Sequence, residues 1–157
     1  MALKPYLFLD TSALFAGIWS AQGGSRLLLR LGEAEVVHLL VSAQVLREIE
    51  DVFRWKAKEY LPVLAILLNQ SRVTVVSAAP TDLWMRCKEF IHHAGDARIL
   101  ADAWHNKADY LVTLDRAHFL GIPDLAREIP IQIGTPGDCL AWLRSQFSLN
   151  DQELQKN

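Results

Sequence analysis

The chain has 157 residues, of which 51% are hydrophobic and 22% charged, and its 16 Lys+Arg against 18 Asp+Glu give a formal net charge of −2. This length and composition suit one domain with one hydrophobic core, and they exclude a largely disordered chain. The balance of charges excludes a protein that coats nucleic acid through bulk positive charge, so any such contact must use a local patch. The apolar runs are shorter than the roughly 18 residues that a membrane span needs, so we expect no membrane segment.

The first residues carry no recognisable export signal, and the two cysteines, Cys87 and Cys139, have neither metal-site spacing nor the pattern of a disulfide framework. Both thiols are expected to be small buried groups in a reducing compartment. We therefore expect a cytoplasmic protein.

Short runs of β-branched, aromatic and other apolar residues alternate along the chain with segments of helical period. The predicted strands are Tyr6–Leu9, Val36–Val41, Val73–Val76, Tyr110–Leu114 and Ile129–Ile133. The predicted helices are Gly24–Leu31, Ser42–Lys58, Tyr60–Asn69, Thr81–His92, Asp96–Lys107 and Pro136–Gln146. Strands that are apolar almost throughout are typical of a parallel sheet covered by helices on both faces. The pattern predicts a three-layer α/β/α domain with a central, mainly parallel five-stranded sheet.

The last predicted helix has a marked start, because Thr135 can cap it and Pro136 suits the first helical position. After this helix the sequence becomes polar and lacks an apolar face. We therefore predict a domain over residues 1–147 and a polar C-terminal tail over residues 148–157 that frays or folds back loosely.

The loops of common α/β nucleotide and hydrolase sites are absent from the sequence. There is no G-x-G-x-x-G, no G-x-x-x-x-G-K-[ST] and no G-x-S-x-G. The segment Gly23-Gly24-Ser25 lacks the lysine of a phosphate loop, so a plain loop before a helix is the simpler interpretation. A phosphatase with an aspartyl nucleophile at Asp10 would have a second acid at position 12, where Ser12 stands.

Two acids stand at the ends of predicted strands. Asp10 closes the first strand, and Asp115 closes the strand that begins at Tyr110. Ligands bind to open parallel sheets in the crevice outside the carboxyl ends of the strands, and both acids belong to that edge. Either acid alone is more simply a helix cap or a turn residue, but two acids placed alike favour a site.

Helical geometry points to further acids. Asp96 shares a helix face with apolar residues and points inward, whereas Asp102 projects away from that face and is expected to be a solvated charge. In the preceding part of the chain, Glu48 and Glu50 lie on the two flanks of a buried helical stripe, and periodicity does not choose between them.

The histidines offer no ligand spacing in the sequence. His92 and His93 are adjacent, and neighbouring helical residues diverge by about 100°, so they do not readily share a metal. His38, His105 and His118 also lack a partner at a ligand spacing. We expect no metal ligand among them.

Taken together, these segments resemble the PIN-domain nucleases. The resemblance is carried by Phe8–Leu14, by Ser42 with Val45–Ile49, by Asp96 with Ile99–Ala103, by Ala108–Asp115, and by Ile131–Pro136. It extends from about Leu7 to about Leu143, and its strength lies in four acids in the family's order. The family often has Asn at the position of Ser12 and commonly Gly at that of Leu114, and neither departure removes an acid.

The resemblance implies a metal-dependent endoribonuclease that hydrolyses RNA phosphodiester bonds at a four-carboxylate site, and it selects Glu48 over Glu50. Its metal ligands and catalytic residues would be Asp10, Glu48, Asp96 and Asp115. The expected cofactor is Mg²⁺ or Mn²⁺, because these hard cations prefer oxygen ligands. Four converging carboxylates repel one another, and a cation would neutralise that repulsion.

Residues next to these acids have plausible supporting roles. The hydroxyls of Ser12 and Thr113 are suited to orienting carboxylates and metal-bound water, although strand or turn positions explain them equally well. Arg98 and Arg116 are candidates for contacting substrate phosphates, against the simpler interpretation of surface charges.

The resemblance also implies partners. Single-domain relatives of this size include toxin ribonucleases that form homodimers and pair with a small antitoxin, and their substrate is single-stranded or looped RNA. The alternative is a catalytically silent PIN-like module that binds RNA or a partner protein through the same fold.

Overall fold

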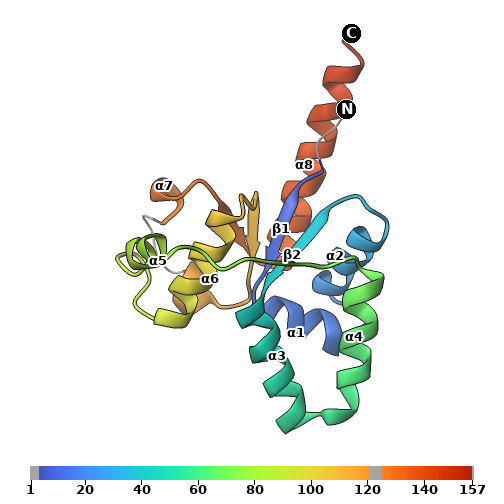
Figure 1. Cartoon of the computed structure of the whole chain (residues 1–157). Helices are drawn as coiled ribbons and strands as arrows, with labels where there is room; N and C mark the ends of the chain where they lie inside the picture. Colours follow the sequence, from blue (N-terminus) through green and yellow to red (C-terminus); the bar gives the residue numbers. More distant parts are fainter. Residues whose placement is uncertain (1–3, 121–124, 157) are drawn as a thin grey trace.

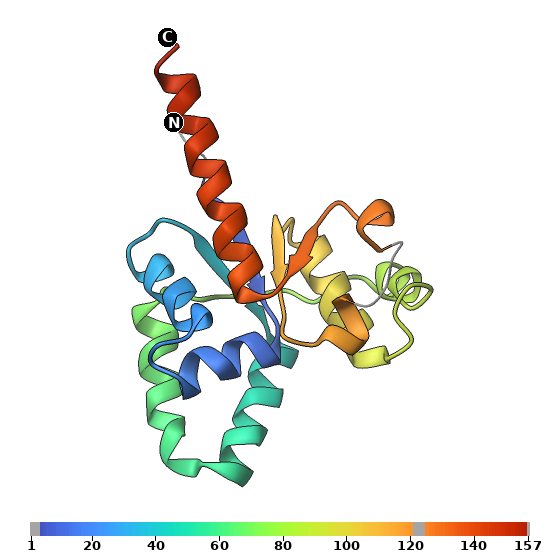
Figure 2. The same cartoon turned by 180° about the vertical axis from the view of Figure 1, so that it is seen from behind.

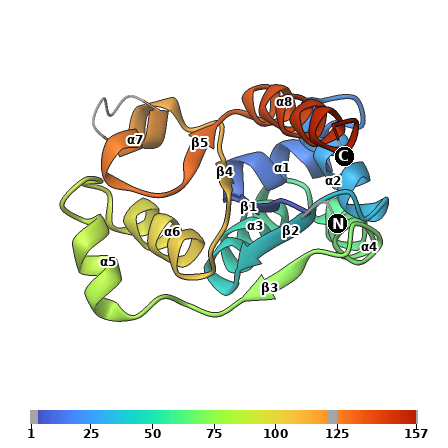
Figure 3. The ribbon, with the colours of Figure 1, turned by 90° about the horizontal axis from the view of Figure 1, so that it is seen from above.

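The computed structural model describes residues 4–120 and 125–156. Within these residues, five parallel strands form one sheet in the order β3-β2-β1-β4-β5. Figure 1 labels the neighbouring strands β1 and β2, and Figure 3 labels all the strands. The strands are β1 (Tyr6–Leu9), β2 (His38–Ser42), β3 (Thr74–Val76), β4 (Tyr110–Val112) and β5 (Gln132–Gly134). In the central register, Leu7 of β1 lies opposite Leu39 on one side and Tyr110 on the other.

Helices connect the strands and cover both faces of the sheet. They are α1 (Thr11–Trp19), α2 (Gly24–Glu33), α3 (Ala43–Lys56), α4 (Leu61–Gln70), α5 (Thr81–Cys87), α6 (Ala94–His105), α7 (Leu125–Glu128) and α8 (Pro136–Leu154), with the 3-10 turn η1 (Lys58–Tyr60) and the π-helical turn η2 (Arg116–Leu120). Figure 3 shows α1, α2 and α8 on one face of the sheet and α5 and α6 on the other. The predicted three-layer α/β/α fold with a parallel sheet is confirmed.

The core lies around the central strand. Leu7, Phe8 and Leu9 of β1 are all buried, because helices pack on both faces of this strand. This explains why β1 is apolar without alternation and why its predicted bounds are the observed ones. With β1 and β4 adjacent and parallel, their carboxyl ends lie side by side.

Helix α1 was not predicted from the sequence. It begins directly after Asp10 and is apolar on nearly all sides, so it lacks the amphipathic period by which the other helices were recognised. Its residues Ala13, Leu14, Gly17 and Ile18 are buried. The short elements η2 and α7 were also missed, and α5 ends at Cys87 rather than at His92.

Helix α8 is longer than predicted. It starts at the expected capping box of Thr135 and Asp138, but it continues past Gln146 to Leu154. No glycine or proline follows Gly137 in the sequence, so nothing in the chain breaks the helix there. Figure 2 shows its C-terminal part extending away from the sheet and the other helices. No helix within residues 4–120 and 125–156 combines the length and apolar character needed to cross a membrane.

Candidate functional site

Four carboxylates line one cavity at the carboxyl edge of the sheet. Asp10 follows β1, Glu48 lies on α3, Asp96 lies in the first turn of α6, and Asp115 follows β4. The cavity has a volume of about 520 Å³. The fold therefore brings together all four acids of the predicted site, although they come from four separate segments.

Asp10 is the most buried of these acids, with 4% of its surface exposed. Its Oδ1 caps helix α1 by accepting hydrogen bonds from Ala13 N at 2.8 Å and Ser12 Oγ at 2.7 Å, and its Oδ2 accepts one from Thr113 Oγ1. Burial raises the pKa of Asp10 above its ordinary value, although these hydrogen bonds oppose the effect. The nearby charge of Asp115 raises this pKa further.

The hydroxyls of Ser12 and Thr113 connect the ends of β1 and β4. Besides donating to Asp10, Ser12 Oγ accepts a hydrogen bond from Leu114 N at 3.0 Å, and Thr113 Oγ1 accepts one from Asp115 N at 3.0 Å. The two side chains therefore hold the backbone before Asp115 against the Asp10 carboxylate. Thr113 is fully buried.

Glu48, rather than Glu50, faces the cavity. Its carboxylate accepts hydrogen bonds from Thr11 Oγ1 and, at 2.9 Å, from Gln44 Nε2. The Gln44 amide also donates to Gly95 O at 3.3 Å, so it bridges α3 to the start of α6. Glu50 is exposed on α3 and is not part of the cavity wall.

Asp96 lies against two imidazole rings. Its Oδ2 is 3.1 Å from His93 Nδ1 and 2.7 Å from His118 Nδ1, and its side chain is 15% exposed. Burial raises the pKa of Asp96, the two histidines lower it, and the charges of Asp115 and Glu48 raise it. The acids are therefore electrostatically coupled, as repulsion between converging carboxylates requires.

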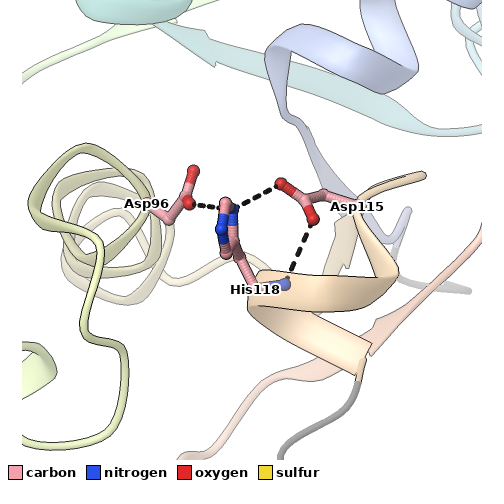
Figure 4. Close-up of side chains that lie close together, drawn as sticks. All are labelled: Asp96, Asp115 and His118. Carbon is pink, nitrogen blue, oxygen red and sulfur yellow. Dashed lines mark hydrogen bonds and ion pairs between the residues drawn. The ribbon is translucent and has the colours of Figure 1, made fainter.

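The structure adds His118, which the sequence analysis left without a role. Its ring lies between the carboxylates of Asp96 and Asp115, as Figure 4 shows. His118 Nδ1 is 2.9 Å from Asp115 Oδ2, and His118 N donates to Asp115 Oδ1 at 3.1 Å. The signal that was missed is the three-residue spacing from Asp115 to His118, which a single helical turn brings together.

The predicted arginines are placed differently. Arg98 stacks its guanidinium on Trp84, with 4.2 Å from Cζ to the ring centroid, and it lines a separate cavity together with Arg47. The side chain of Arg116 lies outside the described part of the structure. A phosphate-binding role for either residue stays a prediction.

Asp102 is not a solvated surface charge, and this prediction was wrong. Only 1% of the residue is exposed, and its Oδ1 accepts a hydrogen bond from Ala79 N at 2.7 Å. Burial raises the pKa of Asp102. The segment before α5 covers this side of α6, and helical periodicity within α6 carries no information about that neighbour.

The donor set of the cavity fits a divalent cation. Carboxylate oxygens are the ligands that Mg²⁺ and Mn²⁺ prefer, and this cavity is lined by Asp10, Glu48, Asp96 and Asp115. The raised pKa values of Asp10 and Asp96 indicate negative charge that is costly without a counter-ion.

The fold and the site define a class of protein, a parallel α/β domain with carboxylates gathered at the carboxyl ends of its central strands. The sequence profile described as "PIN domain" matches residues 6–117, and the chain belongs to the PIN domain family. No curated protein matched the sequence.

The solved structures that share the fold include two complexes. The chain is similar to VapBC2 from Rickettsia felis bound to a DNA fragment from its promoter, with 20% identity and a TM-score of 0.63, over 83% of this chain and 98% of that chain. It is also similar to DNA-bound VapBC from Salmonella typhimurium, with 15% identity and a TM-score of 0.63, over 85% of this chain and 99% of that one.

Proposed function

We propose that this protein is a metal-dependent endoribonuclease. The observation that carries the proposal is the convergence of Asp10, Glu48, Asp96 and Asp115 on one cavity. Such a concentration of negative charge destabilises a fold unless a cation or protons neutralise it, which favours a functional role. Membership of the PIN domain family supports the same conclusion.

The four carboxylates would hold Mg²⁺ or Mn²⁺. A bound divalent ion supplies an activated water near neutral pH and stabilises the charge that develops on a phosphodiester. The chain's contribution is orientation, because both oxygens of Asp10 and of Glu48 accept hydrogen bonds. In each carboxylate one oxygen is held by a nearby residue of its own segment and the other by a threonine from another segment. Rigid ligands keep the site assembled before substrate arrives.

The wall of the cavity supports single-stranded or looped RNA as the substrate. Beside the acids lie the apolar side chains of Phe15 and Val52, and Lys56 adds a positive charge. Apolar surface beside a cation suits an unstacked base attached to a phosphate, whereas a paired duplex keeps its bases inside. With a net charge of −2, binding depends on this local surface.

We further propose that the protein is the toxin of a toxin–antitoxin pair, acts in the cytoplasm and forms a homodimer. The shared fold with the VapC-containing structures named above supports this assignment. An antitoxin would cover the acidic cavity, and an inserted arginine would pair with its carboxylates. Light scattering of the purified protein tests the dimer, and a monomer at all concentrations would contradict it.

The test of the activity is cleavage of a mixed RNA pool in Mg²⁺, in Mn²⁺ and in EDTA. We expect metal-dependent cleavage that Asp10→Asn and Asp96→Asn abolish. Glu48→Gln and Glu50→Gln form a matched pair on one helix, and we expect the first to lose activity and the second to retain it. Intact RNA in every condition, together with no metal binding, would refute the nuclease and favour a silent binding module.

A further inference from the structure

Three side chains of metal-ligand type meet at one point of the acid-lined cavity. Asp96 comes from α6, Asp115 from the end of β4, and His118 from η2. One ligand atom of each lies within 4.8 Å of the other two. Figure 4 shows the imidazole ring between the two carboxylates.

Hydrogen bonding alone does not satisfy this arrangement. His118 Nδ1 lies 2.7 Å from Asp96 Oδ2 and 2.9 Å from Asp115 Oδ2, yet one ring nitrogen carries at most one hydrogen. Asp96 Oδ2 is buried and receives no well-aligned hydrogen bond from any residue between 4 and 120 or between 125 and 156. Ligand-type atoms of three side chains therefore lie close together, and the hydrogen bonds between them do not satisfy all three.

The two contacts of His118 Nδ1 match the separations between neighbouring ligands of one cation as well as those of charge-assisted hydrogen bonds. Nitrogen and oxygen ligands stand about 2.0–2.2 Å from a transition-metal ion, so neighbours at right angles are about 3 Å apart. The two distances from His118 Nδ1 are close to that value. A cation shared by the three atoms would replace the contact between them.

The ring of His118 is held in this orientation from two sides. Its own backbone N–H donates to Asp115 Oδ1 at 3.1 Å, which closes the turn between the two residues. The ring of His93 stacks on it, with 5.1 Å between centroids and 8° between planes. His93 itself caps α6, because its Nδ1 accepts a hydrogen bond from Asp96 N at 3.4 Å, so it positions its neighbours instead of ligating.

We propose that His118 is a nitrogen ligand of the metal that Asp96 and Asp115 hold, and that this ligand makes the site prefer Mn²⁺, Co²⁺ and Zn²⁺ over Mg²⁺. The inference rests on the proposed metal-dependent function, and it specifies which metal ions that function would use. The physical reason is that imidazole nitrogen binds transition metals well, whereas Mg²⁺ selects oxygen ligands. A transition-metal ion would then form a favourable bond to the His118 nitrogen, whereas Mg²⁺ would gain little from it.

The first test is calorimetric titration of the metal-free protein with Mn²⁺ and with Mg²⁺. The variants are His118→Gln and, as a matched control, the exposed His92→Gln. We expect His118→Gln to weaken Mn²⁺ binding by about tenfold or more and Mg²⁺ binding by less than about threefold. The control should bind both ions as the unmodified protein does. Equal losses for the two ions would overturn the proposal, because they would mean that His118 only positions the carboxylates.

The second test follows metal binding by the unmodified protein and uses a variant only to assign one signal. The imidazole ¹⁵N signals are recorded as Zn²⁺ is added, with His118→Gln used to assign its signal. Direct ligation predicts a large shift of the His118 Nδ1 signal and none for His92. Zn²⁺ binding with an unchanged His118 signal would overturn this inference and leave the nuclease intact. Failure of the unmodified protein to bind any of these ions would overturn both.

Discussion

Replacing Thr113 with valine removes one hydroxyl from the centre of the acid site at nearly constant side-chain volume. This hydroxyl donates to Asp10 Oδ2 and accepts a hydrogen bond from Asp115 N at 3.0 Å, and Thr113 is fully buried. The valine would leave a carboxylate oxygen without its donor and a backbone N–H without its acceptor. A hydrogen bond to a charged group contributes about 1.5–3 kcal/mol and a neutral one about 1 kcal/mol, so the free energy of unfolding should fall by about 3 kcal/mol.

The matched control is Thr113→Ser, which keeps the hydroxyl and removes one methyl group, at a cost of about 1 kcal/mol. Both variants are measured by urea denaturation without metal, and a loss of about 3 kcal/mol should also lower Tm by roughly 6–12 °C. The same valine should weaken metal binding by about 10–100-fold, because Asp10 loses a group that orients it.

The pH dependence of this loss has a definite sign. The Thr113 hydroxyl favours the charged form of Asp10, so its removal raises the pKa of Asp10 further above its already raised value. Protonation of Asp10 at low pH then relieves part of the cost of losing the hydroxyl. The difference in free energy of unfolding between Thr113→Val and the unmodified protein should therefore be larger at about pH 8 than at about pH 5. A loss below about 1 kcal/mol, or one that grows as the pH falls, would refute the reasoning.

Three further substitutions test other parts of the structure. Burial raises the pKa of Asp96, so its favourable contribution to stability is present at low pH and is lost as the pH rises through the folded-state pKa. Asp96→Asn should therefore stabilise the metal-free protein at a pH above the folded-state pKa. It should give no gain at a pH below the unfolded-state pKa of an aspartate, near 3.9. Chemical denaturation at several pH values checks both expectations. Asp102→Ala should lower the free energy of unfolding by about 2 kcal/mol, because it leaves Ala79 N without its acceptor. Calorimetry should show unchanged Mn²⁺ affinity. Weakened Mn²⁺ binding would place Asp102 in the site. Gly134→Ala should lower the free energy of unfolding by about 1–3 kcal/mol, because the added Cβ would meet Tyr110 Oη and lie 2.9 Å from Asp138 Cβ. Thermal unfolding measures this loss, and an unchanged Tm would contradict the close packing.

The strands and the strand-end acids were predictable because their signals are local. A strand buried on both faces is apolar throughout, and the residue that follows it stands at the edge of the sheet wherever the strand lies. Asp10 and Asp115 were therefore found from two short runs of residues. Helical period also placed Asp96 on an inward face, and the structure has it in the cavity wall.

Other features lay beyond such local signals. Helix α1 escaped because an almost uniformly apolar helix has no amphipathic period. Periodicity left Glu48 and Glu50 as equivalent flanks, and only the family resemblance selected Glu48. In the structure, the placement of α3 puts Glu48 beside Thr11. Asp102 was misjudged because Ala79, its partner, belongs to a different segment.

The sequence by itself determined a parallel α/β domain with acids at the carboxyl ends of its strands, because the burial pattern and the chain order encode both. Its motifs carried the resemblance to the PIN family. Only the tertiary structure decided which side chains meet across segments. It placed the His118 ring between Asp96 and Asp115, and it brought the Thr113 hydroxyl to the Asp10 carboxylate. Such contacts depend on how elements distant in the chain pack together, and no periodicity within one element records that packing.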